Sequence, residues 1–582
     1  MKTLNRTSLL MLAALTTMVA ACSTDNVLDD ITQSTPGNTA SGGSSSATGE
    51  LTTFAVSIDK TSAEPATTAE EQFPDADEDP LENNTFGTEV SIDLSNPVAK
   101  TENGVEITVR DGHVTANHGS TKQVCYVLSG STSNGSFTVV GEKKYEVRLE
   151  GVSITNPDSA ALNLLCSKRA YIVLGEGTAN TLTDGTNSQN GHKGTLYCKG
   201  KLLFNGNGSL SVTANYNNGI HSADYIVFRT GNKVYVKSSA NHGIKANDGI
   251  YINGGILNIE VSAAAAKGIN CESHICVNGG RTTVITTGAG TYDSDEQEAK
   301  GAACIKADST FTIRGGELWL KSTGSGGKGI NVDAESYFFG GSTYIITEGS
   351  QYQSYNDTAS PKGIKTDGTL NIGGGLLWVR TSGTGGEGIE SKSTLTISGG
   401  EVASYAYDDA INAKSHLTIS GGYVFAQGRN NDGIDANGNM YIQGGTVYAI
   451  SSGGAEVALD ANTEGGYKLY VQGGTIVAVG GLEQGSSLSQ SCYQASWSSN
   501  TWYALTGGNE TFCFRTPSSG GNALVVSTAS TPGLTSGISV SGGTSHFGGL
   551  AATGASVSGG SSASLSSYSG GMSGPGGPGG WR

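Results

Sequence analysis

The sequence lacks the periodicity of a helical protein. No stretch of its 582 residues repeats apolar side chains every 3.6 positions for long enough to form an amphipathic helix. Only 36% of the residues are hydrophobic, which is little for thick globular cores. These absences exclude a helical bundle or a helical solenoid, and they favour a fold built from many short strands.

Motifs of several enzyme classes are absent as well. The sequence has no nucleophile elbow, no glycine-rich phosphate loop and no zinc-type cysteine spacing. Its cysteines show no disulfide framework, although Cys492 and Cys513 could pair in an oxidising compartment. Positive charge is scarce, because 34 Lys and Arg face 51 Asp and Glu, which gives a formal net charge of −17. That balance argues against nucleic acid as a partner and favours cations, calcium above all.

Glycine is abundant instead, with 88 residues. Gly-Gly doublets recur with an aliphatic strand on each side, and successive doublets lie 22 to 36 residues apart. Insertions near 287–301 and 348–362 account for the longest intervals. A repeat of this length, rich in β-branched residues, predicts the coils of an all-β solenoid with parallel strands. The doublets begin at Gly254, Gly279, Gly315, Gly340, Gly374, Gly399, Gly421, Gly444 and Gly473.

The first residues form a candidate export signal. An apolar run from Leu9 to Ala21 ends at Cys22, and the last four residues of this stretch, VAAC, look like a bacterial lipobox. Cys22 would then be lipidated, and the acidic residues soon after it resemble a surface-export tag. We therefore expect an outer-membrane lipoprotein, exposed at the cell surface, that touches the membrane only through its lipid anchor. The alternative is an ordinary signal peptide with a coincidental cysteine.

The composition changes several times along the chain. Serine, threonine and acidic residues dominate 22–85, which is typical of a disordered tether. Strand-like stretches then predict a β cap, a long repeat region and a β-rich closing segment. We therefore assign 1–21 to a lipoprotein signal peptide, 22–85 to the tether, 86–144 to an N-terminal β cap, 145–482 to the parallel β-helix, 483–550 to a C-terminal β segment and 551–582 to a Gly/Ser/Pro-rich tail.

One column of the repeat is aromatic. The third residue after each glycine doublet lies between two aliphatic residues, so it should point outward from its strand. Rings at this position on neighbouring coils would form a flat apolar strip suited to the C–H faces of a glycan. Alternatively, the strip stabilises the sheet or is covered by the insertions or the closing segment. Its aromatic members are Trp319, Tyr344, Trp378, Phe425 and Tyr448.

A second outward column consists of the residue directly after the recurring aliphatic residue of each coil. The first half of this column is basic. Lys245, Lys306 and Lys365 alternate there with asparagine, and His221 comes first. Repeated lysines at coil spacing should repel one another unless they are screened or ligated. A polyanion such as a uronate chain would explain them, and a solvated face is the alternative.

The second half of this column turns acidic. Asp409 and Asp432 lie one coil apart, so their carboxylates should repel or take up protons unless a hard cation with oxygen ligands binds between them. We therefore expect calcium here, with solvated turn carboxylates as the alternative. The candidate ligands are Asp408, Asp409, Asp432, Asp435, Glu387, Glu390 and Asp460.

At these residues, and at the patterns 149–155 (LEGVSIT) and 177–185 (GTANTLTDG), the sequence resembles secreted bacterial carbohydrate-binding proteins related to the calcium-dependent polysaccharide (pectate) lyases. The resemblance covers about 86–550 and implies a right-handed parallel β-helix that binds cellulose-like or acidic plant polysaccharides. The calcium motif of the lyases is matched by 431–435 (NDGID), with Asn431 in place of the first acid. Those lyases also use an uncharged Lys or Arg as base, and Lys468 is the candidate here.

Three functions follow from these expectations. The first is a non-catalytic surface protein that binds polysaccharide along one face of the β-helix, with calcium ordering the acidic turns. The second is a polysaccharide lyase that holds calcium on Asp409, Asp432 and Asp435 and uses Lys468 as base. The third is a structural, adhesin-like rod whose ladders only hold the coils together.

Overall fold

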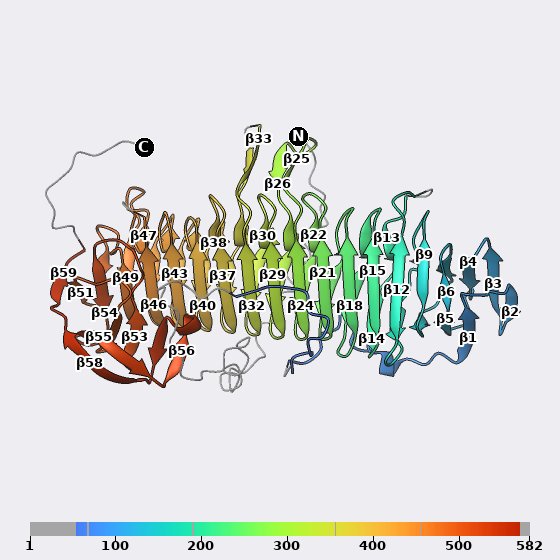
Figure 1. Cartoon of the computed structure of the whole chain (residues 1–582), viewed down its shortest axis with the longest axis horizontal. Helices are drawn as coiled ribbons and strands as arrows, with labels where there is room; N and C mark the ends of the chain where they lie inside the picture. Colours follow the sequence, from blue (N-terminus) through green and yellow to red (C-terminus); the bar gives the residue numbers. More distant parts are fainter. Residues whose placement is uncertain are drawn as a thin grey trace. The chain divides into compact units, whose positions relative to one another are not determined.

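The computed structural model describes residues 54–66, 69–120, 122–188, 191–355, 357–453 and 456–570, all within one compact unit. These residues form a parallel β-solenoid of about 14 turns, which confirms the predicted fold class (Figure 1). No described residue belongs to a helix long and apolar enough to span a membrane. The predicted signal peptide and Cys22 lie outside the described residues.

Three long sheets run along the solenoid. Between its two ends, each coil contributes one strand to each sheet. Sheet A contains, in hydrogen-bonded order, β1 (Thr88–Asp93), β5 (Val124–Ser129), β8 (Tyr145–Leu149), β11 (Ala170–Leu174), β14 (Leu202–Gly206), β17 (Tyr225–Phe228), β20 (Gly249–Ile252), β23 (His274–Val277), β28 (Thr310–Ile313), β31 (Glu335–Phe338), β36 (Leu370–Ile372), β39 (Leu395–Ile397), β42 (Leu417–Ile419), β45 (Met440–Ile442), β48 (Leu469–Val471) and β50 (Ser487–Leu488).

Sheet B begins with an antiparallel β2–β3–β4 meander and continues with parallel strands. Its strands are β2 (Lys100–Glu102), β3 (Val105–Arg110), β4 (His113–Asn117), β7 (Ser136–Val140), β10 (Leu162–Leu164), β13 (Gly194–Cys198), β16 (Asn218–Ser222), β19 (Ile244–Ala246), β22 (Lys267–Cys271), β27 (Ala303–Ala307), β30 (Lys328–Val332), β35 (Lys362–Thr366), β38 (Glu387–Ser391), β41 (Ile411–Ala413), β44 (Ile434–Ala436) and β47 (Leu459–Ala461).

Sheet C is parallel from β6 to β49 and ends in three antiparallel strands. Its strands are β6 (Ser131–Thr132), β9 (Ser153–Asn156), β12 (Ala179–Asp184), β15 (Ser209–Ala214), β18 (Lys233–Ser238), β21 (Ile256–Val261), β24 (Arg281–Thr286), β29 (Glu317–Ser322), β32 (Ser342–Thr347), β37 (Leu376–Thr381), β40 (Glu401–Ala406), β43 (Tyr423–Gly428), β46 (Thr446–Ser451), β49 (Thr475–Val479), β54 (Leu524–Ser527), β51 (Cys492–Ala495) and β59 (Ser566–Tyr568).

The repeat forms coils because its aliphatic residues stack inside and its glycine doublets turn the chain. In sheet B the inward ladder runs from Ile220 through Ile244 and onward to Leu459, and these side chains are fully buried. Each such burial stabilises the fold by roughly 1.5–3 kcal/mol. The doublets connect sheet A to sheet C. At Gly400, φ is +80° and a Cβ atom would lie 2.7 Å from the carbonyl oxygen of Gly375, so this turn position requires glycine.

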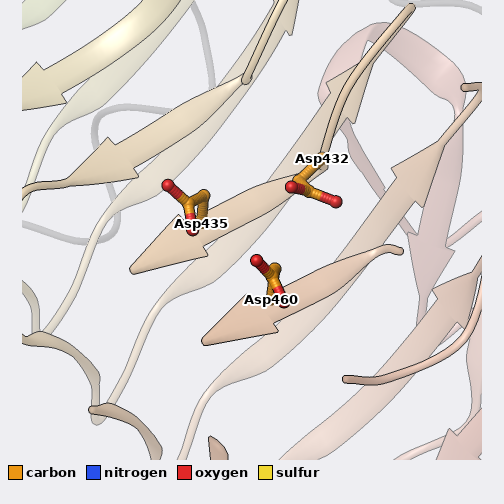
Figure 2. A group of neighbouring side chains, drawn as sticks. All are labelled: Asp432, Asp435 and Asp460. Atoms are coloured by element: carbon orange, nitrogen blue, oxygen red, sulfur yellow. The ribbon is translucent and has the colours of Figure 1, made fainter. Parts of the chain in front are cut away.

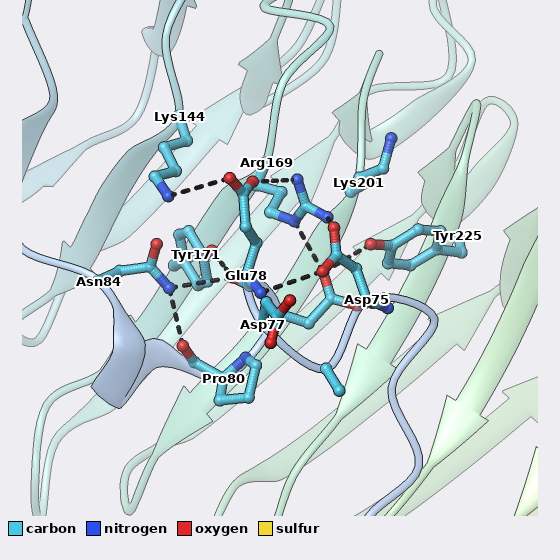
Figure 3. A network of polar contacts seen from close by, with 12 residues as sticks. Asp75, Asp77, Glu78, Pro80, Asn84, Lys144, Arg169, Tyr171, Lys201 and Tyr225 are labelled. Carbon is cyan, nitrogen blue, oxygen red and sulfur yellow. Dashed lines mark hydrogen bonds and ion pairs between the residues drawn. The ribbon is translucent and has the colours of Figure 1, made fainter.

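The segment before the solenoid differs from the predicted tether. Its described residues, 54–66 and 69–87, lie along the solenoid and include the 3-10 helix η3 (Leu81–Asn83). Arg169 pairs with Asp75 and Glu78, as Figure 3 shows, and also with Asp79, which is fully buried. The acidic residues that indicated disorder therefore bind two arginines beside sheet A. Arg169 directly precedes β11, and Arg229 directly follows β17.

The C-terminal region also differs from its predicted boundaries. Residues 551–568, assigned to the low-complexity tail, contribute β57, β58 and β59, and only 571–582 lie outside the description. Cys492 and Cys513 are both free and buried, in different sheets, so the suggested disulfide is not formed. The C-terminal sheet consists of β56 (Thr544–His546), β57 (Ala551–Thr553), β53 (Phe512–Arg515), β52 (Trp502–Thr506), β55 (Gly533–Ser541) and β58 (Ser556–Ser562), and η4 (Phe547–Gly549) follows β56.

Candidate functional site

The outer face of sheet B carries one continuous polar column. The strand register places the predicted residues directly above one another, one on each coil, as expected from the repeat. Along the solenoid the column reads His221, Lys245, Asn270, Lys306, Asn331, Lys365, Glu390, Asn412, Asp435 and Asp460.

The three predicted lysines of this column each reach a neighbouring carboxylate. Lys245 Nζ lies 2.7 Å from Glu272 Oε1, and Lys365 Nζ lies 2.6 Å from Asp367 Oδ1. Lys306 is held between Asp308 and Asp333. These pairs are partly exposed, so they stabilise the fold little and leave the ammonium groups accessible to a ligand.

Two further lysines of the same sheet form no ion pair with another described residue. Lys267 and Lys328 begin β22 and β30 and donate to backbone carbonyl groups, Lys267 to that of Gly301 at 2.8 Å and Lys328 to that of Gly326 at 3.2 Å. Burial and neighbouring lysines lower the pKa of Lys267 to about 8 and that of Lys328 to about 7. Burial and neighbouring lysines therefore destabilise the ammonium form of both side chains, and an anionic group beside them would stabilise it.

A pocket opens at the start of the column, with a volume of about 320 Å³. Asn218 donates through Nδ2 to the carbonyl oxygen of Lys193 at 2.8 Å, whereas its Oδ1 is buried without a hydrogen-bond partner. Burial lowers the pKa of His221, so this imidazole is neutral at pH 7. The pocket thus offers donors and acceptors together. Its lining residues are Lys193, Asn217, Asn218, His221, Asn241, Lys245, Asn247 and Glu272.

At the other end of the column, three aspartates converge (Figure 2). Asp435 in β44 and Asp460 in β47 are register partners, and Asp432 comes from the turn before β44. One carboxylate oxygen from each lies within 4.8 Å of the others. Asp409, from the previous coil, accepts the backbone N–H of Asp432 at 3.1 Å, so it supports the turn that carries this cluster.

Burial in this cluster disfavours negative charge. It raises the pKa of Asp432 and of Asp435 to about 7, and further carboxylates nearby add to the effect. Burial also raises the pKa of Asp409, to about 8, and that of Asp460, which is hydrogen-bonded to Glu483. Oxygen ligands that share a small space in this way suit a hard divalent cation.

Sequence reasoning missed Glu483, although a signal was present. Leu482 forms a parallel bridge with Leu459, so Glu483 is the next member of the column after Asp460. Leu482 forms only an isolated bridge rather than a strand, so the strand pattern that marks the other coils is missing at this position. Glu483 also accepts a hydrogen bond from Thr463 Oγ1 at 3.0 Å.

Three other predicted ligands lie outside the three-aspartate cluster. Glu387 and Glu390 pair with Lys362 at 2.7 and 2.8 Å, and Glu390 also contacts Lys392. These ion pairs neutralise the two glutamates without a metal ion, although Oε2 of Glu387 is buried and accepts no hydrogen bond within the described part of the chain. Asp408, the remaining predicted ligand, is half-buried and is not one of the three converging aspartates.

The aromatic column of sheet C stacks as predicted, but it is not open to a ligand. Register pairs Trp319 with Tyr344 and Tyr344 with Trp378, and the first two rings stack at 4.1 Å. Four of the five predicted rings are buried, and only Trp319 is half-buried. The expected glycan-binding strip is therefore a second hydrophobic core.

The cover of this core comes from both ends of the described chain. Phe54 contacts the Tyr344 ring at 5.5 Å and the Trp378 ring at 6.3 Å. At the C-terminal end, Phe547 lies 5.6 Å from Phe425, and Phe514 lies 5.4 Å from Tyr448, the other two predicted rings.

Lys468 does not fit the role of a lyase base at the acidic cluster. It is exposed and directly precedes β48 of sheet A, whereas Asp435 and Asp460 belong to sheet B. Its backbone N–H donates at 2.9 Å to Oδ1 of Asn439, which directly precedes β45, another strand of sheet A. Sequence proximity suggested this lysine, but the intervening turn places it on another face.

The described chain is thus a parallel β-solenoid with a polar, ligand-accessible column on one sheet. It belongs to the family described as carbohydrate-binding domain-containing protein, whose model matches residues 110–404, just over half of the chain. The match includes the pocket and the basic half of the column, and the acidic cluster lies beyond it.

Two known proteins resemble the chain over part of its length. A carbohydrate-binding domain-containing protein of Acetivibrio thermocellus is 32% identical over 126 residues, and the match spans 20% of this chain and 44% of that relative. A solved structure of a polysaccharide lyase-like protein from C. thermocellum, a gadolinium derivative, covers 49% of this chain and 96% of its own, with 23% identity and a TM-score of 0.32.

Proposed function

We propose that the chain binds polysaccharide along the outer face of sheet B, from the pocket at His221 toward Lys365. The observation that carries this proposal is a pocket whose lining combines several asparagine amides with the ammonium groups of Lys193 and Lys245. Sugar hydroxyl groups both donate and accept hydrogen bonds, so they match such a mixed lining. The family match over this region supports the same function.

The charge of the face favours acidic glycans. Lys193 and Lys245 line the pocket, and Lys267, Lys306 and Lys328 place further amino groups on the next coils of sheet B. A uronate carboxylate would accept charge-assisted hydrogen bonds from these groups, which are about twice as strong as neutral ones. Cellulose-like glycans would use the hydroxyl contacts alone and bind more weakly.

Affinity electrophoresis in gels with polygalacturonate or hydroxyethylcellulose tests the proposal. The double variant His221→Gln, Lys245→Gln removes two pocket groups and should weaken polygalacturonate binding at least about tenfold, or ~1.4 kcal/mol. The control is Lys237→Ala, which removes an exposed lysine of β18 in sheet C. Equal retardation of the double variant and wild type would refute the proposed site.

We also propose that Asp432, Asp435 and Asp460 hold calcium, supported by Asp409 and Glu483. Three carboxylate oxygens within 4.8 Å carry this proposal. The ion would neutralise the repulsion among them and fix the turn between β43 and β44. Calorimetric titration of wild type with calcium should show one site that Asp460→Asn weakens. Equal calcium affinity of the two chains would contradict it.

Finally, we propose a lipid anchor at Cys22, on the strength of the lipobox-like sequence before it. Labelled palmitate supplied to cells should enter the wild-type chain and not Cys22→Ala. Protease added to intact cells should cleave the wild-type chain if it faces outward. Label in Cys22→Ala would show that lipid is attached elsewhere.

A further inference from the structure

The two insertions of the repeat form a pair of projecting hairpins that touch each other. The first hairpin is β25 (Thr291–Asp293) with β26 (Glu298–Lys300), and the second is β33 (Tyr352–Ser354) with β34 (Asp357–Ala359). They leave the solenoid where strands of sheet C turn into β27 and β35 of sheet B. Figure 1 shows them standing beyond the other turns on that edge.

Specific contacts hold the hairpins together. The backbone N–H of Ala299 donates to Asp357 Oδ2 at 2.6 Å. At the base, a Cβ atom on Gly290 would lie 2.5 Å from Tyr352 Cγ, so only glycine permits this close packing. Lys300 joins Asp293 and Glu296 at 2.8 and 2.7 Å and stiffens the first hairpin. The pair is therefore a preformed unit.

An exposed aromatic pair lies on this unit. The rings of Tyr292 and Tyr355 have centroids 4.6 Å apart at 49°, so one hairpin supports the ring of the other. Tyr355 is 86% exposed, the highest value among the large exposed hydrophobic side chains of the described chain. Its φ of +53° is rare for a bulky non-glycine residue, so this backbone conformation is unfavourable for tyrosine and must be stabilised by the rest of the hairpin.

We propose that Tyr355, backed by Tyr292, is a stacking platform for a pyranose ring of the polysaccharide that lies along sheet B. This inference rests on the proposed function. A sugar ring presents a C–H face for an aromatic ring, and its hydroxyl groups can donate to the carboxylates of this hairpin, Asp293, Glu296 and Glu298 around Lys300. Since these carboxylates would repel a free uronate, the stacked unit is a neutral or esterified sugar of the chain. A protein partner would instead need an apolar patch around the anchor, and Tyr355 is isolated among polar groups.

The position of the hairpins suits a long chain rather than a short one. The pocket at His221 belongs to β16, and β27, which follows the first hairpin, is three strands further along sheet B. At about 4.8 Å per strand, β27 is about 14 Å from β16 along the solenoid, and β35, which follows the hairpin of Tyr355, is about 24 Å from it. A polymer can reach both the pocket and the platform at once, so the platform adds affinity by binding a second part of the same molecule.

Affinity electrophoresis with partly methyl-esterified polygalacturonate, together with calorimetry with trigalacturonate, tests the inference. Tyr355→Ala should weaken polymer binding about tenfold and leave trisaccharide binding unchanged, because the short ligand occupies only the pocket. Tyr355→Phe should keep wild-type affinity, since stacking uses the ring and not the hydroxyl group. Tyr467→Ala, at a tyrosine that is 40% exposed in the turn before β48, is the matched control and should bind as wild type.

The outcomes separate this inference from the proposed function. If Tyr355→Ala binds polymer as wild type while the His221, Lys245 double variant does not, the platform is refuted and the sheet B site stands. If Tyr355→Ala and Tyr355→Phe weaken binding equally, ring stacking is refuted. A wild-type chain that binds neither polygalacturonate nor trigalacturonate overturns both.

Discussion

Sheets A and C differ from sheet B in what lies on their outer faces. On sheet A, the outward residues Tyr171, Leu203 and Val227 are buried beneath Phe73 and Leu81 of the N-terminal segment. On sheet C, the aromatic column is buried beneath Phe54 and the C-terminal region. The column of sheet B is polar, and the described satellite hydrophobic clusters do not include it.

The covers extend over β11 to β20 on sheet A and over β29 to β49 on sheet C, and along those stretches the difference favours sheet B as the face for a ligand. The same repeat builds all three sheets, so the inward ladders are alike and only the outward columns distinguish them. Apolar columns acquire a cover from segments outside the repeat, because burial of aromatic surface is favourable. A column of lysine, asparagine and aspartate gains nothing from such a cover and remains available. The function of the solenoid therefore follows from the polar column rather than from the aromatic one.

The largest predicted effect tests the covered state of sheet C. Phe425 is fully buried between Phe547 and neighbouring rings, so Phe425→Ala should lower the free energy of unfolding by about 3–5 kcal/mol. Urea denaturation followed by circular dichroism measures this. Tyr467→Ala, at a partly exposed ring, should cost less than about 1 kcal/mol. A loss below about 1 kcal/mol for Phe425→Ala would mean that the aromatic column is open after all.

The next effect tests the cover of sheet A. Arg169→Met removes the partner of the buried Asp79 and should destabilise the chain by about 3 kcal/mol, because it leaves a carboxylate buried without its cation. Limited proteolysis should then cleave within 69–86. Lys144→Met, which breaks an exposed contact with Glu78, is the control. Unchanged protection of 69–86 in Arg169→Met would show that this ion cluster does not hold the segment.

A smaller effect concerns the acidic end of sheet B. The raised pKa values of Asp432 and Asp435 mean that the folded chain holds protons that the unfolded chain releases from about pH 4 upward. With chelator present, the free energy of unfolding should therefore fall as the pH rises from about 4 to about 7. Calcium at a hundred times its Kd should add about 2.7 kcal/mol at pH 8 and much less at pH 5. If calcium raised the free energy of unfolding equally at pH 8 and at pH 5, the aspartate cluster would not be its binding site.

The sequence predicted the fold well because the fold is its repeat. Glycine doublets and β-branched strands determine each coil locally, and columns such as Lys245, Asn270 and Lys306 follow from counting. The cover on Trp378 could not be predicted in the same way. It depends on contacts with Phe54, more than 300 residues away in sequence, that no periodicity encodes.

The candidate site also combines residues that the repeat places with residues that it does not place. Asp432, Asp435 and Asp460 converge because they obey the repeat. Lys468 does not, because a turn after β47 carries it to sheet A. The hairpins lie outside the repeat altogether, so their mutual contact and the exposure of Tyr355 became visible only in three dimensions.

Hydrogen–deuterium exchange with and without polygalacturonate tests the central claim most directly, since it reports which sheet the ligand covers. The account predicts slower exchange at β16, β19, β22 and the turns that flank them, with no change on the outer edges of sheets A and C. Protection confined to sheet A or sheet C, with sheet B unaffected by saturating polysaccharide, would contradict it.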